Sequence, residues 1–153
     1  MDKYLLAGFL VKARTKMYAG DGGKVTPLLF GSVQLEYQEN TVLYRDIYYV
    51  GNGRFTGLET IYSETKPVWT MSYFGNFSAL SEKEIDAVLR KALTANPQTR
   101  MWKTVKWKSG EFEYICAADA DGSMEELSGS ETITKNGTRV YYFYYAGGLL
   151  RLA

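Results

Sequence analysis

A segment of 23 residues occurs twice in this chain. The stretch 55–77, FTGLETIYSETKPVWTMSYFGNF, aligns without a gap with the stretch 127–149, LSGSETITKNGTRVYYFYYAGGL, at an offset of 72 residues. Seven of the 23 aligned pairs are identical, whereas ordinary residue usage would give about one or two matches by chance. We therefore predict one domain, 1–153, that is built from two repeats at about 1–78 and 79–153.

Composition supports a real core and excludes several classes of protein. The chain is 46% hydrophobic and 15% aromatic, which suits one compact domain of this length. Eighteen basic residues balance 17 acidic ones, for a net charge of +1, so no global attraction to nucleic acid or a membrane is expected. The apolar run 5–11 is too short to span a bilayer. The single cysteine cannot form an internal disulfide, which favours a reducing cytoplasm.

The chain contains no histidine. This absence removes the Ser-His-Asp and Cys-His nucleophile systems, the histidine-rich zinc sites and the side chain that most often moves protons near neutral pH. Cys116 lies in the strand-like run FEYICAA, where a thiol is usually a packing residue. A non-enzymatic role is therefore favoured, and any enzyme here would have to work with carboxylates, Tyr, Lys or Arg.

Residue periodicity predicts two units, each a helix followed by an antiparallel meander. Helical spacing covers 2–16 and 81–96, and a glycine-rich loop with at most a short extended stretch covers 18–33. Strands are expected at about 34–38, 42–50, 54–63 and 67–74, and after a connector at 98–110 they return at about 111–119, 124–135, 138–145 and 149–152. The expected fold class is α+β, a duplicated helix-plus-antiparallel-meander unit with pseudo-twofold symmetry and a shared core.

Each helix carries a start signal and an apolar stripe. Asp2 is placed to cap the first helix. Ser81 and Glu84 have the spacing of a capping box at the start of the second. The buried positions expected from the periodicity are Leu5, Leu6, Phe9, Leu10 and Ala13 in the first helix and Ile85, Val88, Leu89 and Ala92 in the second.

The repeated strand places a glutamate in its apolar row. Side chains alternate between the two faces of a strand, so Glu131 shares a face with Leu127, Gly129 and Ile133. The intervening positions 128, 130, 132 and 134 are all Ser or Thr and are expected to face water. The repeat predicts a corresponding buried place for Glu59.

A buried carboxylate without a partner costs several kcal/mol, so each glutamate must meet a cation, strong donors or a solvent-filled cavity. Two interpretations are open. One is an internal ion pair, for example with Arg45, Lys66 or Arg139. The other is a cavity in which Glu59 and Glu131 receive a cationic or hydrogen-bonding ligand.

Tyrosines are abundant in the expected strands. The chain has 13, including those of YRDIYY at 44–49 and YYFYY at 141–145. A tyrosine offers a flat apolar body with a polar tip, which suits cation–π contacts and small-molecule pockets. Most strand tyrosines nevertheless serve only packing.

Three other segments carry weaker signals. WKTVKWK at 102–108 alternates basic and aromatic residues, as do surfaces that bind single-stranded nucleic acid, but the low net charge favours a solvent-exposed edge strand guarded by lysines. AGDGGK at 19–24 lacks the Walker spacing. DADGSMEE at 119–126 offers too few spaced ligands for calcium. We therefore expect no cofactor, no metal ion and no nucleic-acid partner.

A set of short motifs carries a family resemblance. They are Tyr44-x-Asp46-x-Tyr48, Gly51, Phe55-x-Gly57-x-Glu59 and Lys66-Pro67-Val68-Trp69-x-Met71-x-Tyr73-x-Gly75, with Tyr18-Ala19 and Gly147-Gly148-Leu149 near the two ends. On these motifs nearly the whole chain resembles a family of uncharacterised bacterial domains, whose members occur alone or behind a helix-turn-helix DNA-binding domain of the Xre type. The resemblance implies a stand-alone domain without an established activity.

The chain departs from that family's pattern in two places. Its early loop lacks a Ser-Arg-Pro-like stretch, and Ala146 stands where a histidine often precedes the paired glycines. A family site that depends on that histidine would be absent or altered here.

These observations lead to a ranked set of hypotheses. We expect a cytoplasmic bacterial protein that is a non-enzymatic small-molecule-binding or sensor domain for a small cationic or aromatic ligand. A protein-interaction or oligomerisation module, with a homodimer left open, is the alternative, and a hydrolase that uses Glu59 and Glu131 as a carboxylate pair is third. The candidate ligand-binding residues are Glu59, Glu131, Tyr44, Asp46, Trp69, Tyr73 and Tyr145.

Overall fold

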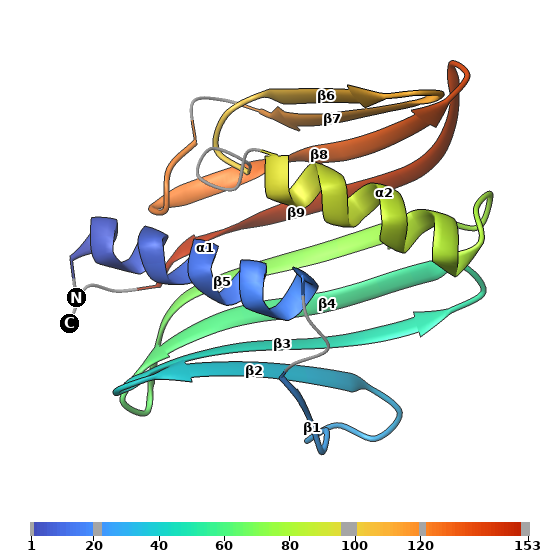
Figure 1. Cartoon of the computed structure of the whole chain (residues 1–153). Helices are drawn as coiled ribbons and strands as arrows, with labels where there is room; N and C mark the ends of the chain where they lie inside the picture. Colours follow the sequence, from blue (N-terminus) through green and yellow to red (C-terminus); the bar gives the residue numbers. More distant parts are fainter. Residues whose placement is uncertain (1, 20–22, 96–100, 120–121, 151–153) are drawn as a thin grey trace.

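The computed structural model of the chain describes residues 2–19, 23–95, 101–119 and 122–150. Within these ranges, nine strands form a single antiparallel sheet in the order β1-β2-β3-β4-β5-β9-β8-β7-β6, and two helices lie on one face of it (Figure 1). The helices are α1 (Lys3–Ala19) and α2 (Glu82–Ala95); the strands are β1 (Lys24–Val25), β2 (Val33–Glu39), β3 (Val42–Gly51), β4 (Arg54–Ser63), β5 (Lys66–Asn76), β6 (Val105–Ser109), β7 (Phe112–Ala118), β8 (Glu126–Lys135) and β9 (Thr138–Leu149). The expected combination of helices with antiparallel sheet is therefore confirmed.

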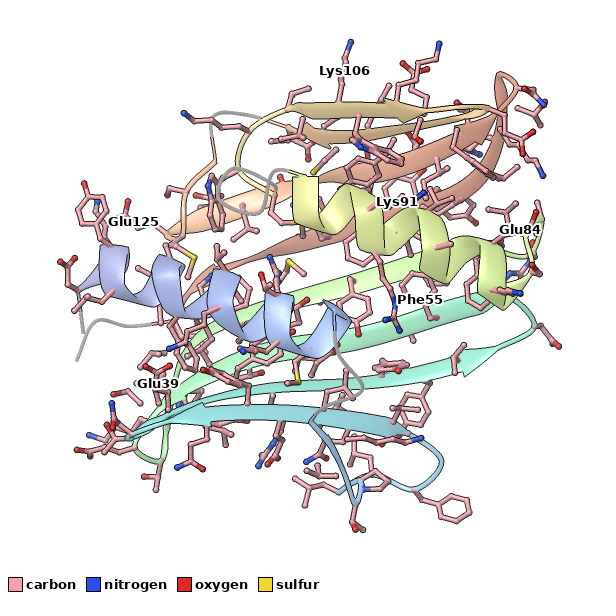
Figure 2. The ribbon with its side chains drawn as sticks, viewed as in Figure 1. Glu39, Phe55, Glu84, Lys91, Lys106 and Glu125 are labelled. Carbon is pink, nitrogen blue, oxygen red and sulfur yellow. The ribbon has the colours of Figure 1, made fainter. Side chains whose placement is uncertain are left out.

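Two elements differ from the sequence prediction. The connector expected at 98–110 contains β6, an edge strand at one end of the sheet, and Figure 2 shows Lys106 at this outer edge. The expected lysine-guarded edge strand is thus confirmed. The separate last strand expected at 149–152 was wrong where it can be tested, because β9 continues without a break to Leu149. Residues 151–153 lie outside the described ranges.

Helix α1 begins where the sequence predicts, but one residue of its expected buried stripe, Leu5, faces solvent. The Tyr4 amide donates to Asp2 Oδ1 at 3.2 Å, which satisfies one of the free N–H groups at the helix start. Leu6, Leu10 and Ala13 are buried, whereas Leu5 is 67% exposed. The prediction for Leu5 was wrong because both Leu5 and Leu6 fit a 3.6-residue period, and only packing against the sheet selects between them.

Helix α2 begins with the predicted capping box. The Glu84 amide donates to Ser81 Oγ at 3.3 Å, and the Ser81 amide donates back to Glu84 Oε2 at 3.0 Å. Val88 and Ala92 are buried and Leu89 packs against the core. The Ile85 side chain lies outside the described part of the structure. Neither helix within the described ranges is long and apolar enough to cross a bilayer.

The five strands after α1 and the four strands after α2 each run as a meander, and the last strands of the two meanders pair with each other at the middle of the sheet. In the β5–β9 ladder, Tyr73 lies directly opposite Tyr145. Tight turns with positive φ at Asn52–Gly53 and Asn136–Gly137 close the hairpins β3–β4 and β8–β9. One cluster of buried side chains includes residues of both meanders and both helices, as expected for a shared core.

Two repeated glycines make room for two repeated tyrosines. Gly57 on β4 lies opposite Tyr73 on β5, and Gly129 on β8 lies opposite Tyr145 on β9. A Cβ added at Gly57 would collide with the Tyr73 hydroxyl and lie 2.7 Å from the Ile47 carbonyl oxygen. Each tyrosine therefore crosses its neighbouring strand above a glycine, an arrangement that also shields the glycine backbone.

Replacement of Gly57 by alanine should therefore destabilise the protein by about 1–3 kcal/mol, because the new methyl group overpacks a filled site. Gly8→Ala is the matched control: Gly8 lies in α1, and an added Cβ would meet no atom within 4 Å. The control should be stabilised by up to about 1 kcal/mol through helix propensity. Urea denaturation measures both, and equal stability of the two variants would contradict the tyrosine–glycine packing.

Candidate functional site

All seven residues proposed from the sequence as ligand contacts lie in the core. None of their side chains is more than 8% exposed. Cross-strand pairing places Tyr44, Asp46, Glu59, Trp69 and Tyr73 on the helix-covered face of β3, β4 and β5. It places Glu131 and Tyr145 on the same face of β8 and β9. These residues are thus positioned to hold the layers together.

Glu59 meets a cation from α1. Arg14 Nε and Nη2 donate to the same Glu59 oxygen, Oε2, at 2.9 and 2.6 Å. Arg14 is 7% exposed and Glu59 is 3% exposed, so the ion pair is buried. The sequence suggested Arg45, Lys66 or Arg139 as partners, but Arg45 pairs instead with Glu36 at 2.7 Å. The internal-pair interpretation therefore holds for Glu59, with a different arginine.

Arg14 could have been found from the helix pattern. It lies one turn after Leu10 and adjoins Ala13, both of which belong to the expected buried stripe. A charged residue inside an apolar helical stripe is expected to need an opposite charge. The helix pattern and the strand alternation together could therefore have predicted the ion pair between Arg14 and Glu59.

Asp46 lies directly opposite Glu59 and is joined to β5 by a tyrosine. The Tyr73 hydroxyl donates to Asp46 Oδ1 at 2.7 Å. It reaches this strand because its ring crosses β4 above Gly57. Trp69, also on β5, packs with its ring centroid 5.8 Å from the Arg14 guanidinium carbon, within the range of a cation–π contact. The predicted residues Asp46, Glu59, Trp69 and Tyr73 therefore form one buried polar cluster with Arg14.

The second meander repeats the tyrosine bridge with different chemistry. The Tyr145 ring crosses β8 above Gly129, and its hydroxyl donates to the Met101 carbonyl at 2.8 Å and lies 3.7 Å from Cys116 Sγ. Cys116 is the cross-strand partner of Glu131, as Asp46 is of Glu59. A thiol thus occupies the place that a carboxylate holds in the first meander.

Glu59 and Glu131 do not share one site. The strand order puts β5 and β9 between their strands. Across the sheet, Glu59 is level with Met71 on β5. Glu131 is level with Phe143 on β9, and Phe143 pairs with Gly75, which lies four residues after Met71 on β5. Standard strand spacings then place the two backbones roughly 20 Å apart. Glycosidase carboxylates lie about 5–10 Å apart, so this geometry gives the carboxylate-pair hydrolase no support.

An accessible pocket of about 290 Å³ lies between α2 and the β6–β7 hairpin. One wall is a single face of the helix and the other is the aromatic side of the hairpin. Figure 2 shows two of the helix residues, Glu84 and Lys91. The pocket is lined by Glu84, Ala87, Val88, Lys91, Trp107, Ser109, Glu111 and Phe112. Sequence reasoning missed it because its walls come from elements that only the tertiary fold brings together.

Two of the lining residues, Glu84 and Glu111, have carboxylates that share an ammonium group from β8, that of Lys135. Lys135 Nζ lies 3.2 Å from Glu84 Oε1, 3.5 Å from Glu111 Oε1 and 5.4 Å from the centroid of the Phe112 ring. Hydrogen bonds from the Ser81 hydroxyl and amide, followed by Lys135, lower the pKa of Glu84 to about 2. The hydrogen bond to Glu84 is also the main cause that raises the pKa of Lys135. Glu84 and Lys135 are therefore both charged at neutral pH.

Metal binding has no structural support in the described ranges, where no group of three or more Cys, Asp or Glu side chains is arranged to hold an ion.

Comparison with known proteins identifies one family. A family model described as a domain of unknown function (DUF5680) matches residues 46–150. No curated protein and no solved structure matches the chain. The matched range begins at Asp46 and contains Glu59, Trp69, Tyr73 and the whole pocket between α2 and β6–β7, whereas Arg14 lies before it. The expected resemblance to an uncharacterised domain is confirmed; a bacterial distribution and an association with Xre-type regulators stay predictions.

The buried ion pair gives a direct test. Glu59→Gln leaves the buried Arg14 guanidinium without its counter-charge and should lower the free energy of unfolding by about 3 kcal/mol. Glu39→Gln is the control, since Glu39 pairs with Lys12 at the surface, where ion pairs contribute little. Chemical denaturation of both variants measures the difference, and a Glu59→Gln protein as stable as the control would show that the pair is dispensable.

Proposed function

The chain belongs to the DUF5680 family of domains of unknown function, and we propose that it is a non-enzymatic small-molecule-binding or sensor domain. The pocket between α2 and the β6–β7 hairpin is the proposed ligand site. The observation that carries the proposal is the combination, in one accessible pocket of about 290 Å³, of aromatic walls with a charged end. Ligand pockets typically measure about 300–1,000 Å³, so this one suits a compact molecule.

The buried cluster around Glu59 plays a supporting part in this proposal. The Glu59 carboxylate already binds Arg14, and Asp46 already accepts from Tyr73. A ligand that displaced these contacts would have to open the core, whereas a ligand in the α2–hairpin pocket leaves them intact. We therefore assign the residues named from the sequence to the scaffold and place the ligand at the pocket.

The ligand class follows from the charges and surfaces of the pocket. Glu84 and Glu111 share the ammonium group of Lys135, so this end carries one excess negative charge, whereas Lys91, two turns further along α2, adds a positive charge to the pocket lining. The face of Phe112 already lies beside that ammonium group, and Trp107 supplies a second aromatic surface. Carboxylates with aromatic faces favour organic cations. A small molecule with an ammonium group and a flat apolar body meets these features.

The non-enzymatic part of the proposal rests on the same residues. Glu84 has a strongly lowered pKa, which makes it a poor proton donor or acceptor near neutral pH. The chain has no histidine to serve in its place. Binding without turnover is the activity that these groups support.

We also propose that the fold arose by duplication of a helix-plus-meander unit. The β5–β9 ladder supports this proposal, because repeat-related residues Tyr73 and Tyr145 face each other there. Both repeated hairpins also shift register after the same isoleucine of the repeat, Ile61 in β4 and Ile133 in β8. A pseudo-twofold axis through the β5–β9 ladder accounts for both features.

A thermal-shift panel tests the binding proposal. Arylalkylamines and aryl quaternary ammonium ions should raise the unfolding midpoint by several degrees, since a ligand at about 100 times its dissociation constant adds roughly 2.7 kcal/mol. Uncharged and carboxylate analogues of the same size should shift it far less.

Two variants locate the site. Trp107→Ala and Glu111→Gln should abolish most of the shift, whereas Glu125→Gln should retain it, because Glu125 pairs with Lys3 away from the pocket. No shift with any amine, or a shift that survives in both pocket variants, would overturn the proposed site.

A further inference from the structure

The carboxylates of Glu84 and Glu111 are each divided between two kinds of donor. Glu84 Oε2 accepts hydrogen bonds from the Ser81 hydroxyl and amide at 2.8 and 3.0 Å, and Glu111 Oε2 accepts one from the Asn136 side-chain amide at 3.2 Å. The other oxygen of each carboxylate, Oε1, faces Lys135 Nζ, at 3.2 Å from Glu84 and 3.5 Å from Glu111. Uncharged donors therefore fix both side chains, and the two Oε1 atoms converge on one ammonium group.

The two carboxylates stand on elements that hold them in place without Lys135. Glu84 lies in the first turn of α2, within its capping box. Glu111 lies in the turn between β6 and β7, and its carbonyl accepts a hydrogen bond from the Asn136 amide at 2.9 Å, which joins this turn to the β8–β9 turn. Groups that other contacts already position are preorganised for a ligand.

The same residues provide the components of a cation site. Glu84, Glu111 and Phe112 all line the pocket, and Lys135 Nζ lies 5.4 Å from the centroid of the Phe112 ring. Carboxylate oxygens beside an aromatic face are the features that bind organic ammonium groups. The hydrogen bond to Glu84 raises the pKa of Lys135, so the lysine is a cation at neutral pH. Three lining residues therefore already bind a cation, and it belongs to the chain itself.

The contacts of Lys135 allow it to be replaced. Its side chain is 32% exposed, and those of Glu84 and Glu111 are 43% and 45% exposed. Ion pairs at such exposed positions contribute little to stability. The ammonium group is carried by a flexible four-carbon stem, so it can move into solvent without displacing the backbone of β8.

We propose that Lys135 is an internal competitor of the ligand: its ammonium group occupies the cation subsite of the free protein, and the ammonium group of a bound ligand replaces it. The inference rests on the proposed function, since it requires the pocket to receive an organic cation. The exchange keeps a positive charge beside Glu84 and Glu111, whereas an uncharged ligand in this place would leave two like charges without a cation. Lys135 thus sets the affinity of the site and favours cationic over neutral ligands.

A purely structural bridge predicts the opposite effect of removing Lys135. If the lysine serves to hold α2 against the two turns, its loss loosens the pocket and weakens ligand binding. If it competes with the ligand, its loss frees the carboxylates and adds one net negative charge, which strengthens the binding of a cation. The two roles therefore differ in the sign of one measurable change.

Isothermal titration calorimetry with phenethylammonium measures that sign. Lys135→Met removes the internal cation and keeps an unbranched stem, and it should lower the dissociation constant about tenfold. Lys135→Arg retains a cation and should bind no more tightly than the wild type. Lys106→Met is the matched control, because Lys106 adjoins Trp107 on β6 and points to the other side of the strand, at the outer edge of the sheet (Figure 2). The control makes the same change in net charge and should leave the dissociation constant within about twofold of the wild type.

Nuclear magnetic resonance of the wild type gives a second readout that needs no variant. Cross-relaxation between the Lys135 Hε protons and the Phe112 ring protons should be present in the free protein, since the ammonium group lies beside that ring. These cross-peaks should disappear when the protein is saturated with phenethylammonium, because the lysine has left the subsite.

The outcomes separate the inference from the proposed function. Equal or weaker binding by Lys135→Met, or cross-peaks that persist at saturation, would overturn the inference and leave the pocket as the ligand site. Absence of binding to the wild type and to Lys135→Met alike would overturn both. Binding by Lys135→Met alone would support the inference and contradict ligand binding by the wild type.

Discussion

The buried ion pair between Arg14 and Glu59 determines how the helix-covered half of the molecule is organised. A carboxylate in the apolar row of β4 requires a counter-charge, and α1 supplies it through two hydrogen bonds to one oxygen. The apolar stripe of α1 alone would allow the helix to slide or rotate over the sheet, as the exposure of Leu5 beside the burial of Leu6 illustrates. The ion pair removes that freedom because its donor and acceptor atoms meet in a single arrangement. The cost of burying the two charges is thus offset by a defined packing of helix on sheet.

That packing occupies the buried polar groups that the sequence suggested as ligand contacts. Once Glu59 binds Arg14 and Asp46 binds Tyr73, the polar groups named from the sequence serve the interior of the protein. The pocket of about 290 Å³ beside α2 is accessible and combines charged groups with aromatic walls, which are the features on which the proposed ligand site rests.

Much of the secondary structure followed from local signals, whereas the site depended on contacts between distant segments. Asp2 and the Ser81–Glu84 capping box are short-range devices, and each occurs as predicted. The burial of Glu59 was predictable from strand alternation. Its partner was not predicted correctly, because the candidates Arg45, Lys66 and Arg139 did not include Arg14, and the packing of helices on strands decides which cation reaches Glu59. The pocket could not be predicted from the sequence for the same reason, because Glu84 and Trp107 come together only when α2 packs on the β6–β7 hairpin. The role of the repeated glycines also depends on the fold, because Tyr73 crosses above Gly57 only when β4 and β5 pair.

A double-mutant cycle on Arg14 and Glu59 tests the central claim most directly. The free energies of unfolding of the wild type, Arg14→Met, Glu59→Gln and the double variant give the coupling energy between the two side chains. The account predicts a favourable coupling of about 2 kcal/mol or more, with the double variant no less stable than the weaker of the two single variants, because removal of both charges leaves neither one buried alone. Additive effects, with a coupling energy near zero, would contradict the claim that this ion pair fixes α1 on the sheet.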